Sequence, residues 1–115
     1  MTGDPRRAEI WLADLGKLRP AVVMHRDFAG RALNAVLVVP LTTTIRDIPT
    51  AVRLGVADGI DRECMASLDN LTLLRKDRFV RRIGALSEER MTQLCHALAV
   101  AVACPTEWPG APQVR

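Results

Sequence analysis

The sequence is poor in the residues that stabilise small secreted proteins. Its 115 residues include three cysteines, Cys64, Cys95 and Cys104, with no C-x-x-C pair and no histidine at zinc-ligand spacing. An odd number of dispersed thiols indicates neither a disulfide framework nor a metal site. We therefore interpret these cysteines as reduced and buried, and expect the chain to fold around one apolar core.

Long apolar runs are missing as well. No window approaches the roughly 18 apolar residues that a membrane span needs. Residues 1–9 contain no apolar segment of the kind found in signal peptides. These absences predict a cytoplasmic protein with no membrane partner.

Aromatic residues and lysines are scarce. The sequence has no tyrosine and only four aromatic residues, Trp11, Phe28, Phe79 and Trp108, which limits binding of single-stranded nucleic acid by base stacking. Two of the sixteen cationic residues are lysine and the rest are arginine. Arginine is the better bidentate phosphate binder, although a GC-rich genome produces the same bias. The formal net charge of +3 permits an anionic partner without requiring one.

Short apolar segments separated by turns dominate the rest of the chain. Alternation and β-branched residues predict strands over residues 8–15, 21–24, 35–41, 51–54, 63–74 and 79–84. Pro20 has no N–H and belongs at a strand start, while Pro40 predicts that its strand leaves the ladder there. Asp69 and Asn70 are candidates for a bend within the fifth segment. Residues 27–34 are expected to form a loop or a turn of helix.

The C-terminal segment is the clearest helix. Ser87 is a favourable N-cap, and apolar residues follow at helical spacing: Met91, Leu94, Cys95, Leu98 and Val102. Pro105 should end the helix. We predict one domain over residues 1–104 and a C-terminal tail over residues 105–115. Strands followed by a helix, without a βαβ period, predict a mostly β fold, a small antiparallel sheet or open barrel plus a helix.

Four segments in this order and spacing resemble the MazF/PemK toxins of bacterial toxin-antitoxin systems: residues 9–15 (EIWLADL), 19–23 (RPAVV), 38–44 (VVPLTTT) and 83–87 (IGALS). The resemblance spans roughly residues 8–103. It implies an SH3-like barrel with appended helices, usually a symmetric homodimer. Members are mostly sequence-specific endoribonucleases that cut single-stranded RNA without a metal or another cofactor, and a cognate antitoxin blocks them.

By the family pattern, Arg19 and Thr42 carry over as the catalytic pair. Metal-free RNA cleavage uses the 2′-hydroxyl as nucleophile, so a site must align it and neutralise the phosphate oxygens. Arginine can clamp a phosphate, and a threonine hydroxyl can donate to the same oxygens. Further candidate RNA-binding residues are Lys17, His25, Thr43, Thr44, Asp69, Asn70 and Arg78.

The general base is not evident from the sequence. Arginine stays protonated, so Arg19 is better described as a charge stabiliser with possible acid character. His25 could serve as acid or base, although a strand-end histidine facing water is the simpler interpretation. For His96 a surface or dimer contact is the favoured interpretation.

Two departures from the family pattern bear on specificity. Many members have a long first loop with a glutamate before the R-P motif, whereas here only residues 16–18 connect the two strands. This difference leaves the cleavage sequence and the docking of the antitoxin open. Asp69 and Asn70 stand where relatives often carry a glutamine or an acid, and they could read a base or simply shape a bend.

Two alternatives and one surface feature stay open. The same fold resembles that of the CcdB toxins, which bind DNA gyrase and cleave nothing. Trp108 near the C-terminus is the one feature that favours this gyrase-binding hypothesis. An inactive barrel kept for binding is a third possibility. The basic residues 75–78, with Arg81 and Arg82, could follow an RNA backbone, although a solvated surface is the simpler interpretation. An exposed sheet edge and an apolar helix face favour a homodimer.

Overall fold

The computed structural model describes residues 4–27 and 33–104. The predicted tail and most of the predicted loop over residues 27–34 lie outside these ranges, as do Phe28 and Trp108. The division into a domain and a tail therefore stays a prediction.

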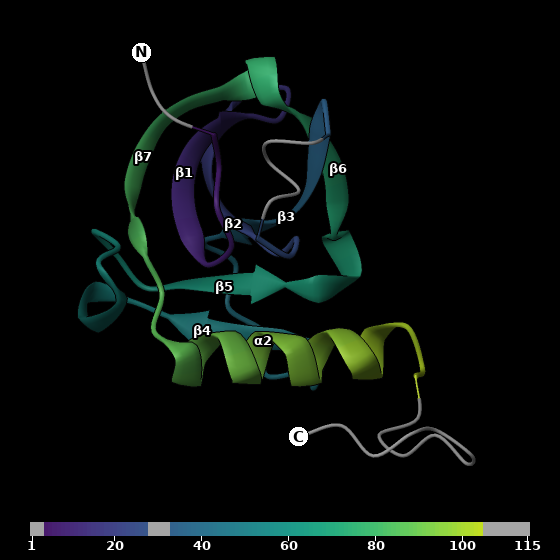
Figure 1. Cartoon of the computed structure of the whole chain (residues 1–115). Helices are drawn as coiled ribbons and strands as arrows, with labels where there is room; N and C mark the ends of the chain where they lie inside the picture. The colour runs from purple at the N-terminus through teal and green to yellow at the C-terminus, as the bar shows by residue number, and fades with distance from the viewer. Residues whose placement is uncertain (1–3, 28–32, 105–115) are drawn as a thin grey trace.

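Seven antiparallel strands and one C-terminal helix make up the described fold (Figure 1). Neighbouring strands in the sheet follow the order β4-β5-β3-β2-β1-β7, and β6 pairs with β3 beside this path. The strands β1, β2, β3, β6 and β7 curl around one interior, and β4 and β5 lie between them and the helix α2 (Figure 1). The prediction of a mostly β, SH3-like antiparallel barrel with an appended helix is confirmed. The elements are β1 (Glu9–Asp14), β2 (Leu18–Val23), β3 (Ala35–Thr42), β4 (Ala51–Leu54), β5 (Cys64–Ser67), β6 (Thr72–Arg75), β7 (Phe79–Ala85), the 3₁₀ turns η1 (Val56–Asp58), η2 (Leu68–Asn70) and η3 (Lys76–Arg78), and α2 (Glu88–Ala101).

The strand β3 is the centre of the sheet and changes its neighbour at Pro40. On one edge it pairs with β6 through Val38 and with β5 from Leu41 onward. Pro40 falls between these two ladders, where a missing N–H costs no hydrogen bond. The prediction that the strand leaves its ladder at Pro40 is thus confirmed for this edge. The predicted fifth segment divides into β5 and β6, with the expected bend in η2.

Pro20 lies inside β2 rather than at its start, which corrects the sequence prediction. In an antiparallel pair, alternate residues bond to opposite neighbours. The Met24 N–H donates to the Leu37 carbonyl at 2.9 Å, so the even-numbered residues of β2 face β3. Pro20 shares that direction, and the ladder between β2 and β3 ends at the next pair, Ala21 and Pro40. Because the missing N–H faces β3, the ladder between β1 and β2 continues past Pro20 to Leu18.

The alternation of apolar residues along the strands produces two cores. Ile10, Val22 and Val39 belong to the core shared with α2. Trp11 and Val38 belong to the second core, on the opposite face of the same strands. Trp11 packs edge to face against Phe79, with ring centroids 5.6 Å apart. Trp11 is therefore a core residue, as its position in the strand predicts.

The helix α2 packs on the barrel of its own chain. The Arg90 N–H donates to the Ser87 hydroxyl at 3.2 Å, which confirms the predicted N-cap. Met91, Leu94 and Ala97 are buried. The helical face that we expected a partner to cover is thus already covered by β4 and η2. The helix also ends at Ala101, before Pro105, and Val102 is 56 % exposed, contrary to the predicted pattern.

The three cysteines differ in environment. Cys64 is buried, Cys95 is half-buried and Cys104 is exposed, so burial is confirmed for Cys64 alone. Among residues 4–27 and 33–104, no helix is long and apolar enough to span a membrane.

Candidate active site

Arg19 and Thr42 lie at matching positions on neighbouring strand ends. Ala21 pairs with Pro40; Arg19 is two residues before Ala21 in β2, and Thr42 is two residues after Pro40 in β3. Residues at matching positions in an antiparallel pair project from the same face. The ladder between β2 and β3 ends at the pair Ala21 and Pro40, so no ladder hydrogen bonds join the strand ends that carry Arg19 and Thr42. The R-P and P-L-T motifs thus place an arginine beside a threonine at one edge of the barrel.

A cavity of about 650 Å³ opens at this edge. Its size lies within the range of roughly 300–1,000 Å³ typical of ligand sites. The walls come from the β1–β2 turn, the end of β3, the loop before β5, and β7. Its lining comprises apolar residues (Ile10, Leu12, Leu18, Pro20, Leu41, Ile60, Ile83), charged residues (Lys17, Arg19, Asp61, Arg62, Arg81), and Thr42, Thr43, Thr44, Gly59 and Cys64.

The Arg19 guanidinium is held in this lining with a donor unused. Its Nε is the one buried side-chain nitrogen or oxygen without a hydrogen-bond partner among the residues that the structure describes. Leaving such a donor unpaired costs about 1–3 kcal/mol, and more for a charged group. An anionic ligand would supply the acceptor, because guanidinium pairs bidentately with phosphate and carboxylate.

Thr42 is oriented by the turn that follows it. The Thr44 N–H donates to the Thr42 Oγ1 at 3.2 Å. This local bond shapes the chain as it leaves β3. A hydroxyl has one proton to donate besides its two lone pairs. Thr42 can therefore accept from the turn and donate its proton toward a ligand in the cavity.

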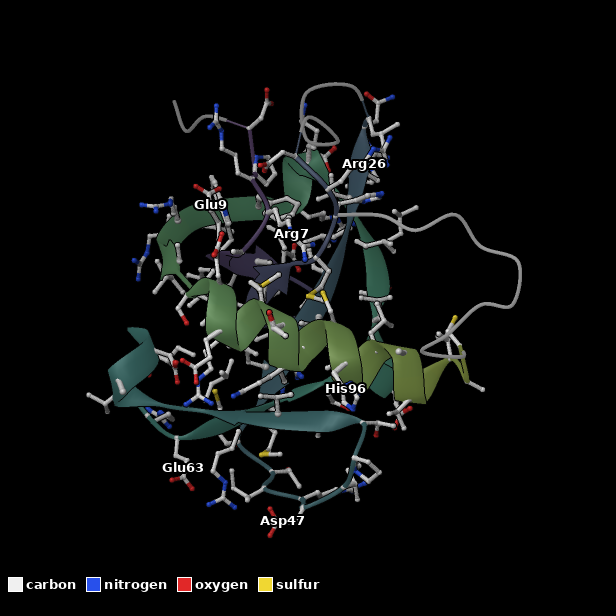
Figure 2. All side chains as sticks on the ribbon, turned by 60° about the horizontal axis from the view of Figure 1, so that its bottom comes forward. Arg7, Glu9, Arg26, Asp47, Glu63 and His96 are labelled. Atoms are coloured by element: carbon white, nitrogen blue, oxygen red, sulfur yellow. The ribbon has the colours of Figure 1, made fainter. Side chains whose placement is uncertain are left out.

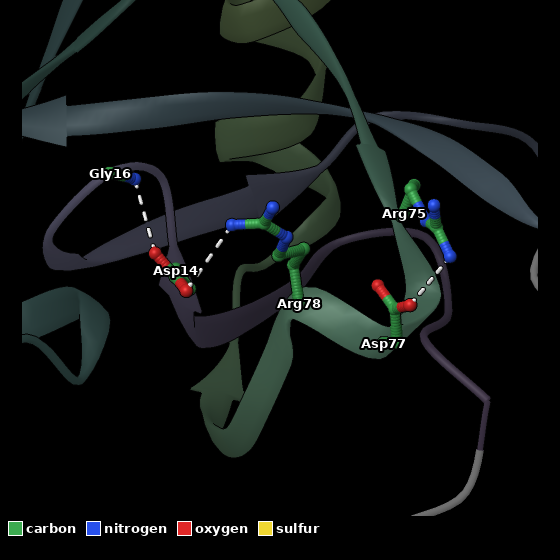
Figure 3. Close-up of polar contacts among 5 residues, drawn as sticks. All are labelled: Asp14, Gly16, Arg75, Asp77 and Arg78. Atoms are coloured by element: carbon green, nitrogen blue, oxygen red, sulfur yellow. Dashed lines mark hydrogen bonds and ion pairs between the residues drawn. The ribbon is translucent and has the colours of Figure 1, made fainter.

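Asp14 organises the short turn that carries Lys17 and leads into β2, where Arg19 lies. Its Oδ1 accepts from the Gly16 N–H at 3.1 Å, and its Oδ2 accepts from Arg78 at 3.3 Å (Figure 3). Gly16 has φ +94°, a conformation that favours glycine. The Asp14 carboxylate thereby ties this turn to η3.

Cationic side chains outnumber acidic ones in the lining. Lys17, Arg19, Arg62 and Arg81 carry positive charge, and Asp61 is the single carboxylate among the described lining residues. The arrangement favours an anion, and several cations spaced around one cavity suit a polyanionic chain better than a single charge.

The structure brings five of the nine predicted site residues into this cavity. Arg19, Thr42, Lys17, Thr43 and Thr44 all line it. Asp61 and Arg62 were not predicted as site residues, because the glycines and aspartates of residues 56–62 are typical of a turn. Arg81 was noted as part of a basic stretch. The pairing of β5 with β3 places the turn beside Thr42, and no local pattern signals that closeness.

His25 lies at the other end of β2. Its Nδ1 accepts from the Leu37 N–H at 2.8 Å, where the ladder between β2 and β3 begins. The ring is half-buried and is not part of the cavity lining. His25 was expected to face water, but its ring instead accepts a hydrogen bond at the end of the ladder between β2 and β3. Its position does not support acid–base chemistry beside Arg19.

Asp69, Asn70 and Arg78 also lie outside the cavity lining. The Thr50 hydroxyl donates to Asp69 at 2.6 Å, and the Asn70 amide donates to the Ser67 hydroxyl at 3.3 Å. Both contacts support the bend between β5 and β6. Of the two interpretations left open by the sequence, these contacts favour the bend.

His96 is exposed on α2 and lines a separate groove against β4 (Figure 2). This position matches the interpretation of His96 as a surface residue.

Two arginines of the basic stretch, residues 75–82, form ion pairs within the chain. Arg75 pairs with Asp77 at 2.7 Å and Arg82 pairs with Glu9 at 2.8 Å.

Cys64 is a buried thiol in the cavity wall. Burial raises its pKa, and the nearby carboxylates of Asp58, Asp61 and Glu63 raise it further. The thiol is therefore protonated at neutral pH. No group of three or more His, Cys, Asp and Glu within the described ranges could hold a metal ion.

Fold and cavity together define a small antiparallel barrel protein with a predominantly cationic cavity at one edge. The sequence model for the "PemK-like, MazF-like toxin of type II toxin-antitoxin system" family matches residues 6–102. The chain belongs to this family, which confirms the resemblance seen in the sequence.

Named relatives cover nearly the whole chain. The "Probable endoribonuclease MazF5" of Mycobacterium tuberculosis is 41 % identical over 108 residues, which span 90 % of this chain and 98 % of that protein. The "Probable endoribonuclease MazF2" of the same species is 35 % identical over 101 residues, spanning 86 % and 99 % of the two chains.

Solved structures show the same fold. An "Endoribonuclease in complex with its cognate antitoxin from Mycobacterial species" is 31 % identical and superposes with a TM-score of 0.80, covering 90 % of this chain and 99 % of that one. The "Mycobacterium tuberculosis toxin MazF-mt6" is 29 % identical with a TM-score of 0.80, covering 87 % and 99 %.

Proposed function

We propose that this chain is the toxin of a toxin-antitoxin pair and a sequence-specific endoribonuclease that cuts single-stranded RNA in the cavity at Arg19 and Thr42. The observation that carries the proposal is the unpartnered, buried Arg19 Nε opposite Thr42 in a cationic cavity. Relatives that align along nearly the whole chain are named endoribonucleases, which supports this activity.

The cleavage uses the 2′-hydroxyl next to the scissile phosphate. Arg19 binds the non-bridging oxygens through its planar fork of N–H groups and stabilises the charge that grows on them. Thr42 donates its hydroxyl proton to the same phosphate and fixes the geometry of attack. The products are a 2′,3′-cyclic phosphate and a 5′-hydroxyl. This chemistry requires no metal and no other cofactor.

The remaining cavity cations bind the RNA strand on either side of that phosphate. Lys17, Arg62 and Arg81 supply charge, while Thr43 and Thr44 supply hydroxyl groups near the scissile site. With few aromatic residues, binding depends more on phosphate contacts than on stacking, so it should weaken steeply with salt. His25, Asp69, Asn70 and Arg78 remain predictions for contacts beyond the cavity.

The proposed partners follow from the same family. One structural relative is described as an endoribonuclease in complex with its cognate antitoxin. We infer that a cognate antitoxin also restrains this chain, that the chain forms a homodimer, and that it acts on RNA in the cytoplasm. Growth arrest with loss of intact RNA is the expected result of expression without the antitoxin.

The test is cleavage of a mixed-sequence single-stranded RNA by purified protein in EDTA, with the product ends mapped. Wild type should cut at a short recurring sequence, and Arg19→Ala and Thr42→Ala should lose about 100-fold to 1,000-fold in rate. Arg53→Ala is the matched control, because Arg53 pairs with Asp47 and Glu63 and does not line the cavity. Intact RNA with wild-type protein would overturn the proposal.

The gyrase-binding alternative receives no support from the relatives, which are named endoribonucleases. Growth arrest with double-strand breaks in DNA and intact RNA would restore it.

A further inference from the structure

The proposed reaction needs a group that takes the proton from the 2′-hydroxyl. A general base must be deprotonated before the reaction and must lie near the reacting groups. Residues placed away from the cavity fail the second condition. His25, the most obvious candidate in the sequence, is such a residue, and its Nδ1 is already occupied by the Leu37 N–H.

Most ionisable groups in the cavity fail the first condition. The guanidinium groups of Arg19, Arg62 and Arg81 stay protonated. Lysine ammonium likewise carries protons and has no lone pair to accept one, which removes Lys17. The Cys64 thiol is kept neutral by burial and by the carboxylates around it, which raise its pKa.

Asp61 is the remaining ionisable group of the lining, and a carboxylate has oxygens that can accept a proton. It is the single carboxylate among the described residues of the lining. Its side chain is 84 % exposed, and its contact with Arg62 is long at 3.8 Å, so its oxygens remain accessible. Asp61 and Cys64 both line the cavity.

We propose that Asp61 is the proton acceptor of the cleavage reaction, an assignment that rests on the proposed function. The 2′-oxygen attacks phosphorus and forms the new O–P bond, and its proton moves to the Asp61 carboxylate. The bond from phosphorus to the 5′-oxygen breaks, and that oxygen takes a proton from water. Asp61 then returns its proton to solvent, which restores the enzyme.

The β1–β2 turn, residues 15–17, contributes no carboxylate to the cavity lining. Asp61 supplies a carboxylate to the same cavity from the loop before β5. The charged residues that share the cavity lining with Asp61 are Lys17, Arg19, Arg62 and Arg81. Asp58 and Glu63 are its acidic neighbours in the sequence and do not line the cavity.

The test compares Asp61→Asn with wild type in single-turnover cleavage in EDTA, over about pH 5 to about pH 9. Asp61→Asn should cut about 100-fold more slowly or worse, since a general base contributes that much or more. It should also lose the rise in rate with pH on the acid side. RNA affinity should be unchanged or tighter, because the variant removes a negative charge near the phosphates. Added formate should partly restore cleavage by Asp61→Ala.

Glu63→Gln is the matched control. Glu63 is a neighbouring exposed carboxylate that pairs with Arg53 and does not line the cavity. It should leave the rate and its pH profile unchanged. Urea unfolding of each variant checks that the fold is intact.

The outcomes separate the two proposals. If wild type cuts, Arg19→Ala does not, and Asp61→Asn cuts at the wild-type rate or faster, then Asp61 is not the acceptor and the ribonuclease proposal stands. If wild type leaves RNA intact, the proposed function fails and the assignment of Asp61 fails with it.

Discussion

Arg19 and Thr42 line the same cavity, and each side chain carries a hydrogen-bond donor. The Arg19 Nε is buried without an acceptor, and the Thr42 Oγ1 already accepts from the Thr44 N–H, so its proton is available. Two preset donors at matching strand positions suit an anion that bears more than one oxygen. A phosphodiester is such a group.

The Thr42 hydroxyl is expected to act through its proton rather than its shape. Thr42→Val keeps the branched shape and removes the hydroxyl, so cleavage should fall about 100-fold to 1,000-fold. Thr42→Ser keeps the donor and should stay within about tenfold of wild type. Thr92→Val, on the exposed surface of α2, is the control and should cut normally. Equal loss in Thr42→Val and Thr42→Ser would contradict a role for the hydroxyl.

Asp14 is expected to act as a positioning residue. Asp14→Ala removes acceptors for Gly16 and Arg78 and should lower the free energy of unfolding by about 1 kcal/mol. Because the freed turn leads directly into β2 and Arg19, kcat should fall about tenfold with a smaller change in KM. Asp77→Ala breaks only an exposed pair with Arg75 (Figure 3) and should change neither quantity measurably. A normal kcat in Asp14→Ala would show that the β1–β2 turn keeps its conformation without Asp14, and would contradict the positioning role.

The Cys64 thiol should be unreactive in the folded protein. At about pH 8 a disulfide reagent should modify Cys104 rapidly and Cys64 only after unfolding, because burial raises the Cys64 pKa and the thiolate is the reactive form. A raised folded-state pKa also stabilises the fold below the thiol's ordinary pKa, and this contribution is lost as pH rises above it. Urea titrations should therefore show a smaller alkaline loss of stability for Cys64→Ala than for wild type. Identical slopes would contradict the shift.

Leu94 is the central residue beneath α2. Its side chain is fully buried, so Leu94→Ala should lower the free energy of unfolding by about 2–5 kcal/mol. Val100→Ala on the exposed side of the same helix should change it by less than about 0.5 kcal/mol. Chemical denaturation of both variants makes the comparison. Similar costs at the two positions would contradict the observed packing of the helix.

The homodimer prediction now depends on the sheet rather than on the helix. The helix face is covered within the chain, but β4 and β7 end the sheet, and Leu73 on β6 is 61 % exposed. Open edges and exposed apolar residues favour association about a two-fold axis. Sedimentation at micromolar concentration should give twice the 12.7 kDa of one chain. A single-chain mass would count against the dimer.

Much of the fold was predictable because its signals are local. Alternation in residues 35–41 and the spacing of Met91 and Leu94 follow from the strand and helix periods alone. The position of Pro20 was misjudged, since the direction of its missing N–H depends on which neighbour it faces. The apolar face of α2 was predicted to be covered by a second copy of the chain. An amphipathic pattern shows that one face of a helix is buried, but it does not show which part of the molecule covers that face.

The sequence by itself determined that short strands and one C-terminal helix form, and that an arginine and a threonine lie near the ends of two of these strands. Those features depend on side-chain period and on missing backbone donors, which are properties of short segments. Only the tertiary structure decided that Arg81 and the turn at Asp61 join Arg19 and Thr42, while His25 lies at the far end of β2. The reason is physical: the cavity is closed by pairings between strands distant in the chain, and their register is set by the packing of the whole core.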